Sequence, residues 1–384
     1  MKEFVTIKDF GPLKDLKNVE IKPVTVLIGE SAIGKSTLMK VLALMRYLYK
    51  MANIRSYLRH SNITRSPFRI RIEDMLKKME MAHMLKTDSR IEYSVCMDNG
   101  NQYSIAIEKS RSCQLPFIAE KDLIFTKVSY ISENRNIIPM WVERVSKNAG
   151  ATLGYYFHET NDDFSHASEE DQVVELNHVN LKLHITHPKG KAVKLRVEST
   201  KDQHSPIELR EASSGVQSSA PLVLIVKYFA KYFSFKDAFN RSVLNYLHDV
   251  QRLTKFKAVT EASELAKWVY VHIEEPELSL FPDAQCKLIE ELLNIATHTS
   301  EDRKLNLMFA THSPYILNYL NIILNQTDET RAHVSASDMA VYRIYEGQVQ
   351  DLLMQDDNGR TIVDTYDLTE MMGNIYREFN ELEA

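Results

Sequence analysis

The chain has 384 residues and a formal net charge of −5, and 44% of its residues are hydrophobic and 26% are charged. This composition indicates an ordinary globular protein with enough chain for a sizeable core, and it carries no chain-wide signature of a nucleic-acid binder. Three scattered cysteines exclude a disulfide framework or a zinc site. Because the sequence has neither a signal peptide nor an apolar run long enough to cross a membrane, we expect a cytoplasmic protein with no membrane partner.

A phosphate-binding loop is predicted near the N-terminus. Residues 24–28 (VTVLI) predict a buried strand, and residues 37–50 carry apolar side chains at helical spacing. Between them, GESAIGKST at residues 29–37 matches the pattern G-x-x-x-x-G-K-[ST]. Glycines let successive N–H groups face phosphate oxygens, and the following helix adds positive charge at its start. The residues expected to contact a nucleoside triphosphate here are Gly29, Glu30, Ser31, Ala32, Ile33, Gly34, Lys35, Ser36 and Thr37.

Two of these residues have specific expected roles. Lys35 would bridge the β- and γ-phosphates, and Ser36 would offer its hydroxyl to Mg²⁺. The alternative is a glycine-rich turn without a ligand, which would make the strand, loop and helix context a coincidence.

A basic segment follows the loop. Residues 51–90 contain nine Lys or Arg against four Asp or Glu, in a chain whose net charge is −5. We expect a basic helical insertion that contacts double-stranded DNA or RNA, or else an ordinary solvated surface.

Three stretches predict β-hairpins. Residues 91–109 alternate around Asn99-Gly100, residues 178–199 alternate in the same way, and residues 340–353 turn at Glu346-Gly347. The first two predict antiparallel sheet beside the nucleotide core.

The apolar stretch WVYVHIEEPELSLFP, residues 268–282, ends its strand in two adjacent carboxylates. Such a pair is costly in a buried strand unless a cation or a reacting group faces it. Since a phosphate-binding loop needs a second acidic element, we expect Glu274 to bind Mg²⁺, directly or through water, and Glu275 to orient or deprotonate the attacking water. The alternative is a solvated strand end.

Two further motifs flank this strand in the sequence. Residues 213–217 (SSGVQ) open an apolar helix, which alone would be read as an N-cap. Residues 311–314 (THSP) follow an apolar strand and place His312 at its end, where a lone histidine is usually a polar cap.

Taken in order, these motifs resemble those of ABC-type P-loop ATPases in the branch related to the RecF, SMC and overcoming-lysogenization-defect (OLD) proteins. SSGVQ resembles the LSGGQ signature, with departures at Ser213 and Val216, and IEEPELSLFPDAQ resembles the EEPE-x-x-LHP form of the acidic strand, with Phe281 in place of His. VSYISENRNIIPMW, residues 128–141, resembles a Y-I-P-A-E-R element and makes Arg135 a candidate.

The resemblance implies an α/β fold, namely a P-loop NTPase of the ABC type. We expect a single ATPase head over residues 1–384, with a mixed central sheet, a flanking antiparallel sheet and helical insertions. A second helical insertion is expected at 230–266 and a C-terminal hairpin and helix at 319–384. The 72 residues after His312 are too few for the Toprim nuclease domain that full OLD proteins carry.

The resemblance also implies a mechanism. Two heads would enclose two ATP molecules with Mg²⁺, forming an ATP-dependent homodimer. Lys35, Glu275 and His312 would act on the ATP of their own head, while Ser214, Gly215 and Gln217 would contact the ATP of the other head.

The resemblance leaves three roles open. The first is an ATP-driven switch that controls a separately encoded effector, a nuclease or toxin, in bacterial antiphage defence. The second is a RecF-type ATPase of DNA repair that acts directly on DNA. The third is an ATP-dependent scaffold with little hydrolysis. A transporter subunit is disfavoured, because sixty positions separate Ser214 from Glu274.

Overall fold

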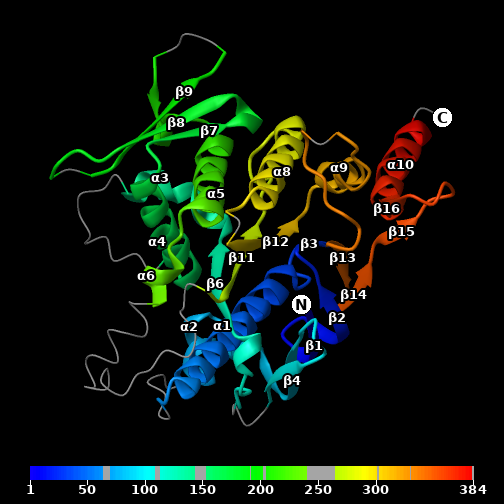
Figure 1. Cartoon of the computed structure of the whole chain (residues 1–384). Helices are drawn as coiled ribbons and strands as arrows, with labels where there is room; N and C mark the ends of the chain where they lie inside the picture. Colours follow the sequence, from blue (N-terminus) through cyan, green and yellow to red (C-terminus); the bar gives the residue numbers. More distant parts are fainter. Residues whose placement is uncertain are drawn as a thin grey trace.

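A six-stranded mixed sheet forms the centre of the molecule (Figure 1). The strand order is β14-β13-β3-β12-β11-β6, and all neighbours are parallel except β13 and β14. The strands are β3 (Val24–Ile28), β6 (Ile124–Ile131), β11 (Ala266–Glu274), β12 (Arg303–Thr311), β13 (Met339–Tyr345) and β14 (Gln348–Asp351). This computed structural model describes residues 1–63, 70–108, 113–142, 153–190, 192–201, 205–239, 264–300, 302–328 and 330–382.

Antiparallel sheets flank this centre. The first has the order β2-β1-β4-β5 and the second β10-β9-β8-β7, while β15 and β16 form a small pair. The three hairpins expected from the sequence are confirmed as β4–β5, β8–β9 and β13–β14. The bounds are β1 (Lys2–Phe10), β2 (Leu13–Ile21), β4 (Leu85–Cys96), β5 (Gln102–Ile107), β7 (Val173–Leu176), β8 (Leu181–Thr186), β9 (Lys194–Ser199), β10 (Ile207–Glu208), β15 (Leu353–Gln355) and β16 (Thr361–Val363).

Helices cover the two faces of the central sheet (Figure 1). Helix α1 lies below the sheet in that view, and α5 and α8 lie side by side above it. The helices are α1 (Lys35–His60), α2 (Ile72–Lys78), α3 (Ile138–Val142), α4 (Tyr155–Glu170), α5 (Ser214–Lys231), α6 (Phe235–Phe239), α8 (Pro282–Thr297), α9 (Pro314–Leu324) and α10 (Tyr366–Glu381). The expected α/β fold with a mixed central sheet and antiparallel sheets is confirmed.

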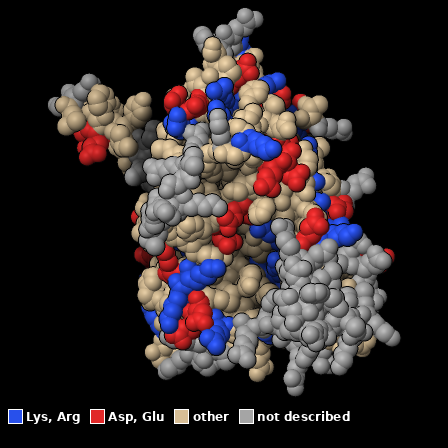
Figure 2. All heavy atoms as spheres, turned by 90° about the vertical axis from the view of Figure 1, so that its left-hand side faces the viewer, with Lys and Arg blue, Asp and Glu red and all other residues tan. Residues whose placement is uncertain are grey.

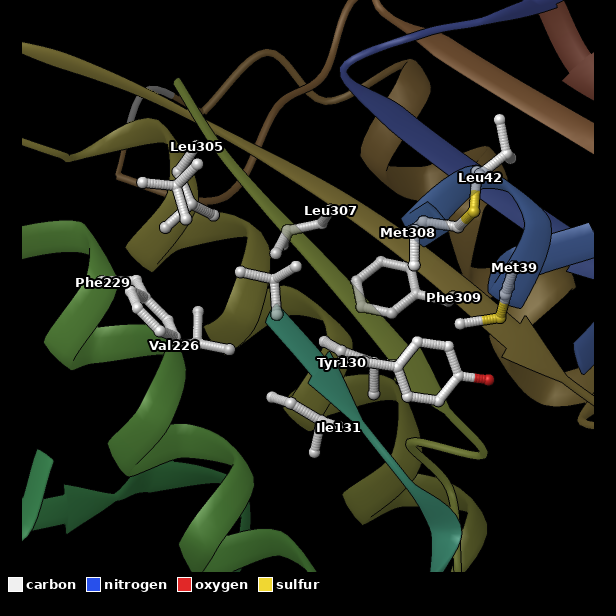
Figure 3. Close-up of a cluster of buried hydrophobic side chains, with 14 of the residues drawn as sticks. Met39, Leu42, Tyr130, Ile131, Val226, Phe229, Leu305, Leu307, Met308 and Phe309 are labelled. Carbon is white, nitrogen blue, oxygen red and sulfur yellow. The ribbon is translucent and has the colours of Figure 1, made fainter. Parts of the chain in front are cut away.

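The core lies on both sides of the central strands (Figure 3). Val226 and Phe229 of α5 pack on one side, and Met39 and Leu42 of α1 pack on the other. All four side chains are buried, so the sheet is held between helices as parallel strands require.

The segments expected to be helical insertions are helical only in part. Residues 51–60 continue α1 and α2 follows, but the chain enters strand β4 at Leu85, because residues 85–96 pair with β1 and β5. Of the stretch 230–266, α6 is described, and residues 240–263 lie outside the described ranges. No helix within the described ranges is both long and apolar enough to cross a membrane.

Candidate active site

The loop between β3 and α1 depends on glycine at two close approaches. At Gly29, where φ is +155°, an added Cβ would lie 2.7 Å from the carbonyl oxygen of Ile344. At Gly34, where φ is +119°, it would lie 2.8 Å from Cδ2 of Leu13. Both the positive φ and the lack of space exclude a larger residue. The loop is therefore fixed between the β1–β2 hairpin and the β13–β14 hairpin.

Lys35 begins α1 and folds back over this loop. Its Nζ donates hydrogen bonds to the carbonyl oxygens of Gly29 and Glu30, each at 2.7 Å. Burial lowers the pKa of Lys35, while the carboxylates of Glu275 and Glu277 act in the opposite direction. The ammonium group thus lies at the mouth of the loop and is held by two carbonyls that an anion could replace.

Glu274 ends β11 as a buried carboxylate. It accepts a hydrogen bond from the Tyr130 hydroxyl at 2.6 Å. Burial acts to raise the pKa of Glu274, but hydrogen bonds from Glu133, Tyr130 and Ser36 outweigh it and lower that pKa. The same contact with Glu274, together with burial, raises the pKa of Glu133 to about 7. Two carboxyl groups and the Ser36 hydroxyl therefore share one small polar site.

Glu275 and His312 leave adjacent strands on the same side of the sheet. Glu275 has a φ of +43°, and its N–H donates to the carbonyl oxygen of Ala310 at 2.8 Å. His312 donates its backbone N–H to Oε1 of Glu277 at 2.7 Å. Its Nε2 lies 3.7 Å from Oε1 of Glu275. The two side chains are partly exposed and face one another.

One cavity of about 210 Å³ joins these groups. Most of the loop residues expected from the sequence line it, and so do Glu274, Glu275 and His312. Gly29, Glu30 and Ile33 are not part of its wall. The lining residues are Ser31, Ala32, Gly34, Lys35, Ser36, Thr37, Glu133, Glu274, Glu275, Ala310 and His312. The convergence of Lys35, Ser36, Glu274, Glu275 and His312, which come from distant parts of the chain, agrees with the arrangement expected from the motifs.

The residues of the SSGVQ stretch do not line this cavity. Ser213 is the N-cap residue of α5, and the Gln217 amide donates to the carbonyl oxygens of Arg210 and Ala212. At Gly215 an added Cβ would lie 2.6 Å from the carbonyl oxygen of Ser279. Within one copy of the chain, this stretch therefore packs against the loop that follows the acidic strand.

Arg135 has a larger part in the site than its sequence indicates. The side chain is fully buried, and its guanidinium donates to the carbonyl oxygens of Glu274 and Glu275, each at 2.6 Å. It also donates to the carbonyl oxygens of Ser132 and Ser218. Burial lowers its pKa to about 10, and nearby carboxylates oppose this shift. Arg135 thus connects the end of the acidic strand to α5.

Glu133 lines the cavity although its sequence position did not identify it as a site residue. A sequence signal was present, because an acidic residue lies two positions after the end of an apolar strand in YISENR. It could not be used without knowing that β6 pairs with β11.

One known protein family matches part of the chain. Residues 157–317 match the AAA ATPase domain family, a range that contains SSGVQ, Glu274, Glu275 and His312. No curated protein matches the chain.

Several solved structures are similar in outline. An SMC head bound to the C-winged helix domain of ScpA has 9% identity and a TM-score of 0.43, covering 93% of this chain and 98% of that one. The SMC head domain from Thermotoga maritima has 10% identity and a TM-score of 0.38, covering 92% and 99%. The recombination mediator RecF has 11% identity and a TM-score of 0.37, covering 92% and 98%.

These TM-scores are too low for superposition to identify the class of protein. The class is inferred from the strand order of the central sheet and the geometry of the phosphate loop. The AAA ATPase domain match, the strand order and the convergence of the loop with the acidic strand support an ABC-type P-loop ATPase.

Proposed function

We propose that this chain binds and hydrolyses ATP and that ATP controls the pairing of two copies. The observation that carries the proposal is the convergence of Lys35, Ser36, Glu274, Glu275 and His312 on one cavity. The cavity combines a cation, phosphate-facing loop residues and carboxylates, which phosphoryl transfer to water requires.

In this proposal the loop binds the triphosphate. Lys35 exchanges its two carbonyl contacts for the β- and γ-phosphate oxygens, which carry a full negative charge. Glu275 lies at the open side of the cavity, where it can orient a water molecule and accept its proton. His312, 3.7 Å from Glu275, is placed to contact the γ-phosphate or that water.

The residues present also fit a magnesium ion. The Ser36 hydroxyl and the Glu274 carboxylate are hydrogen-bonded to one another, and Mg²⁺ prefers such hard oxygen donors. Ser36 and Glu274 would hold the ion, which when bound neutralises charge on the phosphate oxygens.

Pairing of two heads is supported by an exposed apolar residue. Phe281 is the N-cap residue of α8, and 79% of its surface is exposed. It directly follows the loop against which Gly215 packs. Exposed aromatic side chains are typical of interface centres. A second copy seated here would cover Phe281 and bring its Ser214, Gly215 and Gln217 to the ATP.

The biological role we propose is control of a separately encoded effector in bacterial antiphage defence, and it rests on the resemblance to OLD-type motifs. Direct action on double-stranded DNA, as for a RecF-type ATPase, is the second candidate, and the SMC and RecF likenesses motivate its test.

Within the described ranges, several cations of residues 51–90 already pair with carboxylates, as Lys77 does with Glu73 and Arg90 with Glu92. Figure 2 shows Lys and Arg mixed with Asp and Glu on the face that it presents.

Release of phosphate from ATP by the purified chain, with and without double-stranded DNA, tests the proposal. We expect turnover that Lys35→Ala abolishes, because the variant loses the cation at the phosphates. Turnover that persists in Lys35→Ala would contradict the proposal. Strong stimulation by DNA would favour the second candidate.

A further inference from the structure

A second cavity lies behind the edge strand β6, between α1, α2 and α4. Its volume is about 360 Å³, in the range of small-molecule sites. None of the loop residues at the active site lines it. Its wall is formed by Ala43, Tyr47, Lys50, Met75, Lys78, Met79, Lys127, Val128, Tyr130, Tyr155, Tyr156 and Glu159.

Three ammonium groups converge on this cavity, and one carboxylate, Glu159, lines it. Lys127 pairs with Asp163 at 2.9 Å, which neutralises one cation. Lys50 and Lys78 have no ion-pair partner within the described ranges, and burial, reinforced by Lys127, lowers the pKa of Lys50 to about 8. A buried ammonium group without a carboxylate partner is energetically unfavourable, and an anion bound beside it would be stabilised.

Aromatic rings form another part of the wall. Tyr155 and Tyr156 contact edge to face with centroids 5.2 Å apart, and Nζ of Lys78 lies 4.5 Å from the centroid of Tyr155. Tyr47, 42% exposed, stands at the same cavity. Rings beside lysines suit a ligand that has both a planar base and a phosphate.

We propose that this cavity binds a nucleotide by its phosphate and its base, at a site distinct from the phosphate loop. The phosphate lies between Lys50 and Lys78, and the base packs against the tyrosines. The ligand is either a free mononucleotide or the 5′-phosphorylated end of a nucleic-acid strand, since both present the same group. The occupant would also touch Tyr130, whose hydroxyl holds Glu274.

The test is isothermal titration of AMP, and separately of a short 5′-phosphorylated single-stranded oligonucleotide, into the full chain carrying Lys35→Ala. This background removes the lysine of the phosphate loop. Failure of ATP to bind at the loop and binding of AMP at the second cavity are therefore measured independently. We expect one molecule of AMP or of oligonucleotide to bind per chain. Binding of AMP identifies a free mononucleotide as the source, and binding of the oligonucleotide alone identifies a strand end.

Matched variants locate the bound molecule. Lys78 is exposed on α2, so Lys78→Ala should fold normally and weaken binding about tenfold or more, as expected when a charged contact to phosphate is lost. Its neighbour Lys77 pairs with Glu73 outside the cavity, and Lys77→Ala should leave the affinity unchanged. Lys50→Met, which keeps most of the length of the side chain and removes its charge, should weaken binding as Lys78→Ala does.

Three results would overturn the proposal. The first is failure of both probes to bind. The second is an equal affinity for the bound probe in the Lys35→Ala chain and in the same chain carrying Lys78→Ala or Lys50→Met. The third is binding of inorganic phosphate as tight as that of AMP, since the rings would then have no part in recognition.

Discussion

The guanidinium of Arg135 donates to four backbone carbonyl oxygens from three segments of the chain. Those of Glu274 and Glu275 belong to the site itself, and that of Ser218 belongs to α5. A planar fork with five N–H donors can make this set of contacts, whereas an ammonium group cannot. Arg135 thus fixes where the two site carboxylates leave the sheet.

Arg135→Lys should therefore destabilise the fold by about 2–4 kcal/mol, because several buried carbonyls lose their donors. Urea unfolding followed by circular dichroism measures the loss. Arg331→Lys is the control, since Arg331 makes a comparable set of contacts to Glu290 and Tyr319 on the surface. Equal stabilities of the two variants would show that burial of the guanidinium contributes nothing.

Glu275→Gln should retain ATP binding and reduce turnover by about 10²- to 10⁴-fold, since the amide cannot accept the proton of water. Rates of phosphate release and the affinity for ATP separate the two effects. Glu208→Gln, a change on β10 in a separate sheet, should have no effect on turnover. A normal rate in Glu275→Gln would remove this residue from the chemistry.

The cavity-lining residues that the sequence predicted belong to continuous motifs. The loop residues, Glu275 and His312 follow strands directly, so local pattern and chain order were sufficient. The partners of Glu274 were not accessible in this way, because Glu133 reaches it only through pairing of β6 with β11, across more than a hundred positions of sequence. Contacts between distant strands have no local signature.

At the scale of elements, a buried ion pair joins α1 to the first antiparallel sheet. Arg46 donates to Oε2 of Glu3 from Nη2 at 2.6 Å and from Nε at 2.9 Å, and both side chains are 3% exposed. Nη1 of Arg46 lies 3.0 Å from Nε2 of His272 on β11, and Nδ1 of His272 lies 3.2 Å from the carbonyl oxygen of Ser129. Burial and the adjacent Arg46 lower the pKa of His272 to about 3. The neutral ring thus accepts from Arg46 and connects the helix after the loop to the acidic strand.

Arg46→Met should cost about 3–5 kcal/mol, because Glu3 would remain buried without its cation. The double variant Arg46→Met with Glu3→Gln should recover part of this loss, since no unpaired charge then remains. Unfolding free energies of the two single variants and the double variant give the coupling. Additive losses would show that the pair contributes no interaction energy.

Gly215→Ala tests the contact between α5 and the loop after the acidic strand. The added methyl would meet the carbonyl oxygen of Ser279 at 2.6 Å and Cδ2 of Leu280 at 2.9 Å, so one segment must shift. ATP binding should persist, while turnover should fall about tenfold or more through misplacement of the paired heads. Gly373→Ala, on helix α10 with nothing within 4 Å, should leave turnover unchanged. Normal turnover in Gly215→Ala would contradict a role for this contact.

Elements with a local signal were predicted best. The Asn99-Gly100 and Glu346-Gly347 turns predict their hairpins from the local sequence alone. The segment at 85–90 was expected to be part of a helical insertion, yet it pairs with β1 as a strand. Here tertiary pairing overrides a weak local preference.

At the scale of the whole molecule, Phe281 tests the proposed pairing of heads. Phe281→Asp should leave the monomer folded and able to bind ATP, because the side chain is 79% exposed, but should prevent ATP-dependent dimers. Analytical ultracentrifugation of the Glu275→Gln chain with and without ATP measures this directly. Phe379→Asp, at an exposed position of α10, is the matched control. Dimers that persist in Phe281→Asp but not in Phe379→Asp would move the interface to α10.

The position of β3 has a consequence for how the protein is made. This strand delivers the phosphate loop, yet its two neighbours in the sheet are β12 and β13, which end at Thr311 and Tyr345. Gly29 of the loop lies against the carbonyl of Ile344, and the N–H of Lys14 donates to the carbonyl oxygen of Gly347. A ribosome must therefore add all residues up to the β13–β14 hairpin before the loop can take its shape, and a growing chain would hold no ATP until that hairpin emerges.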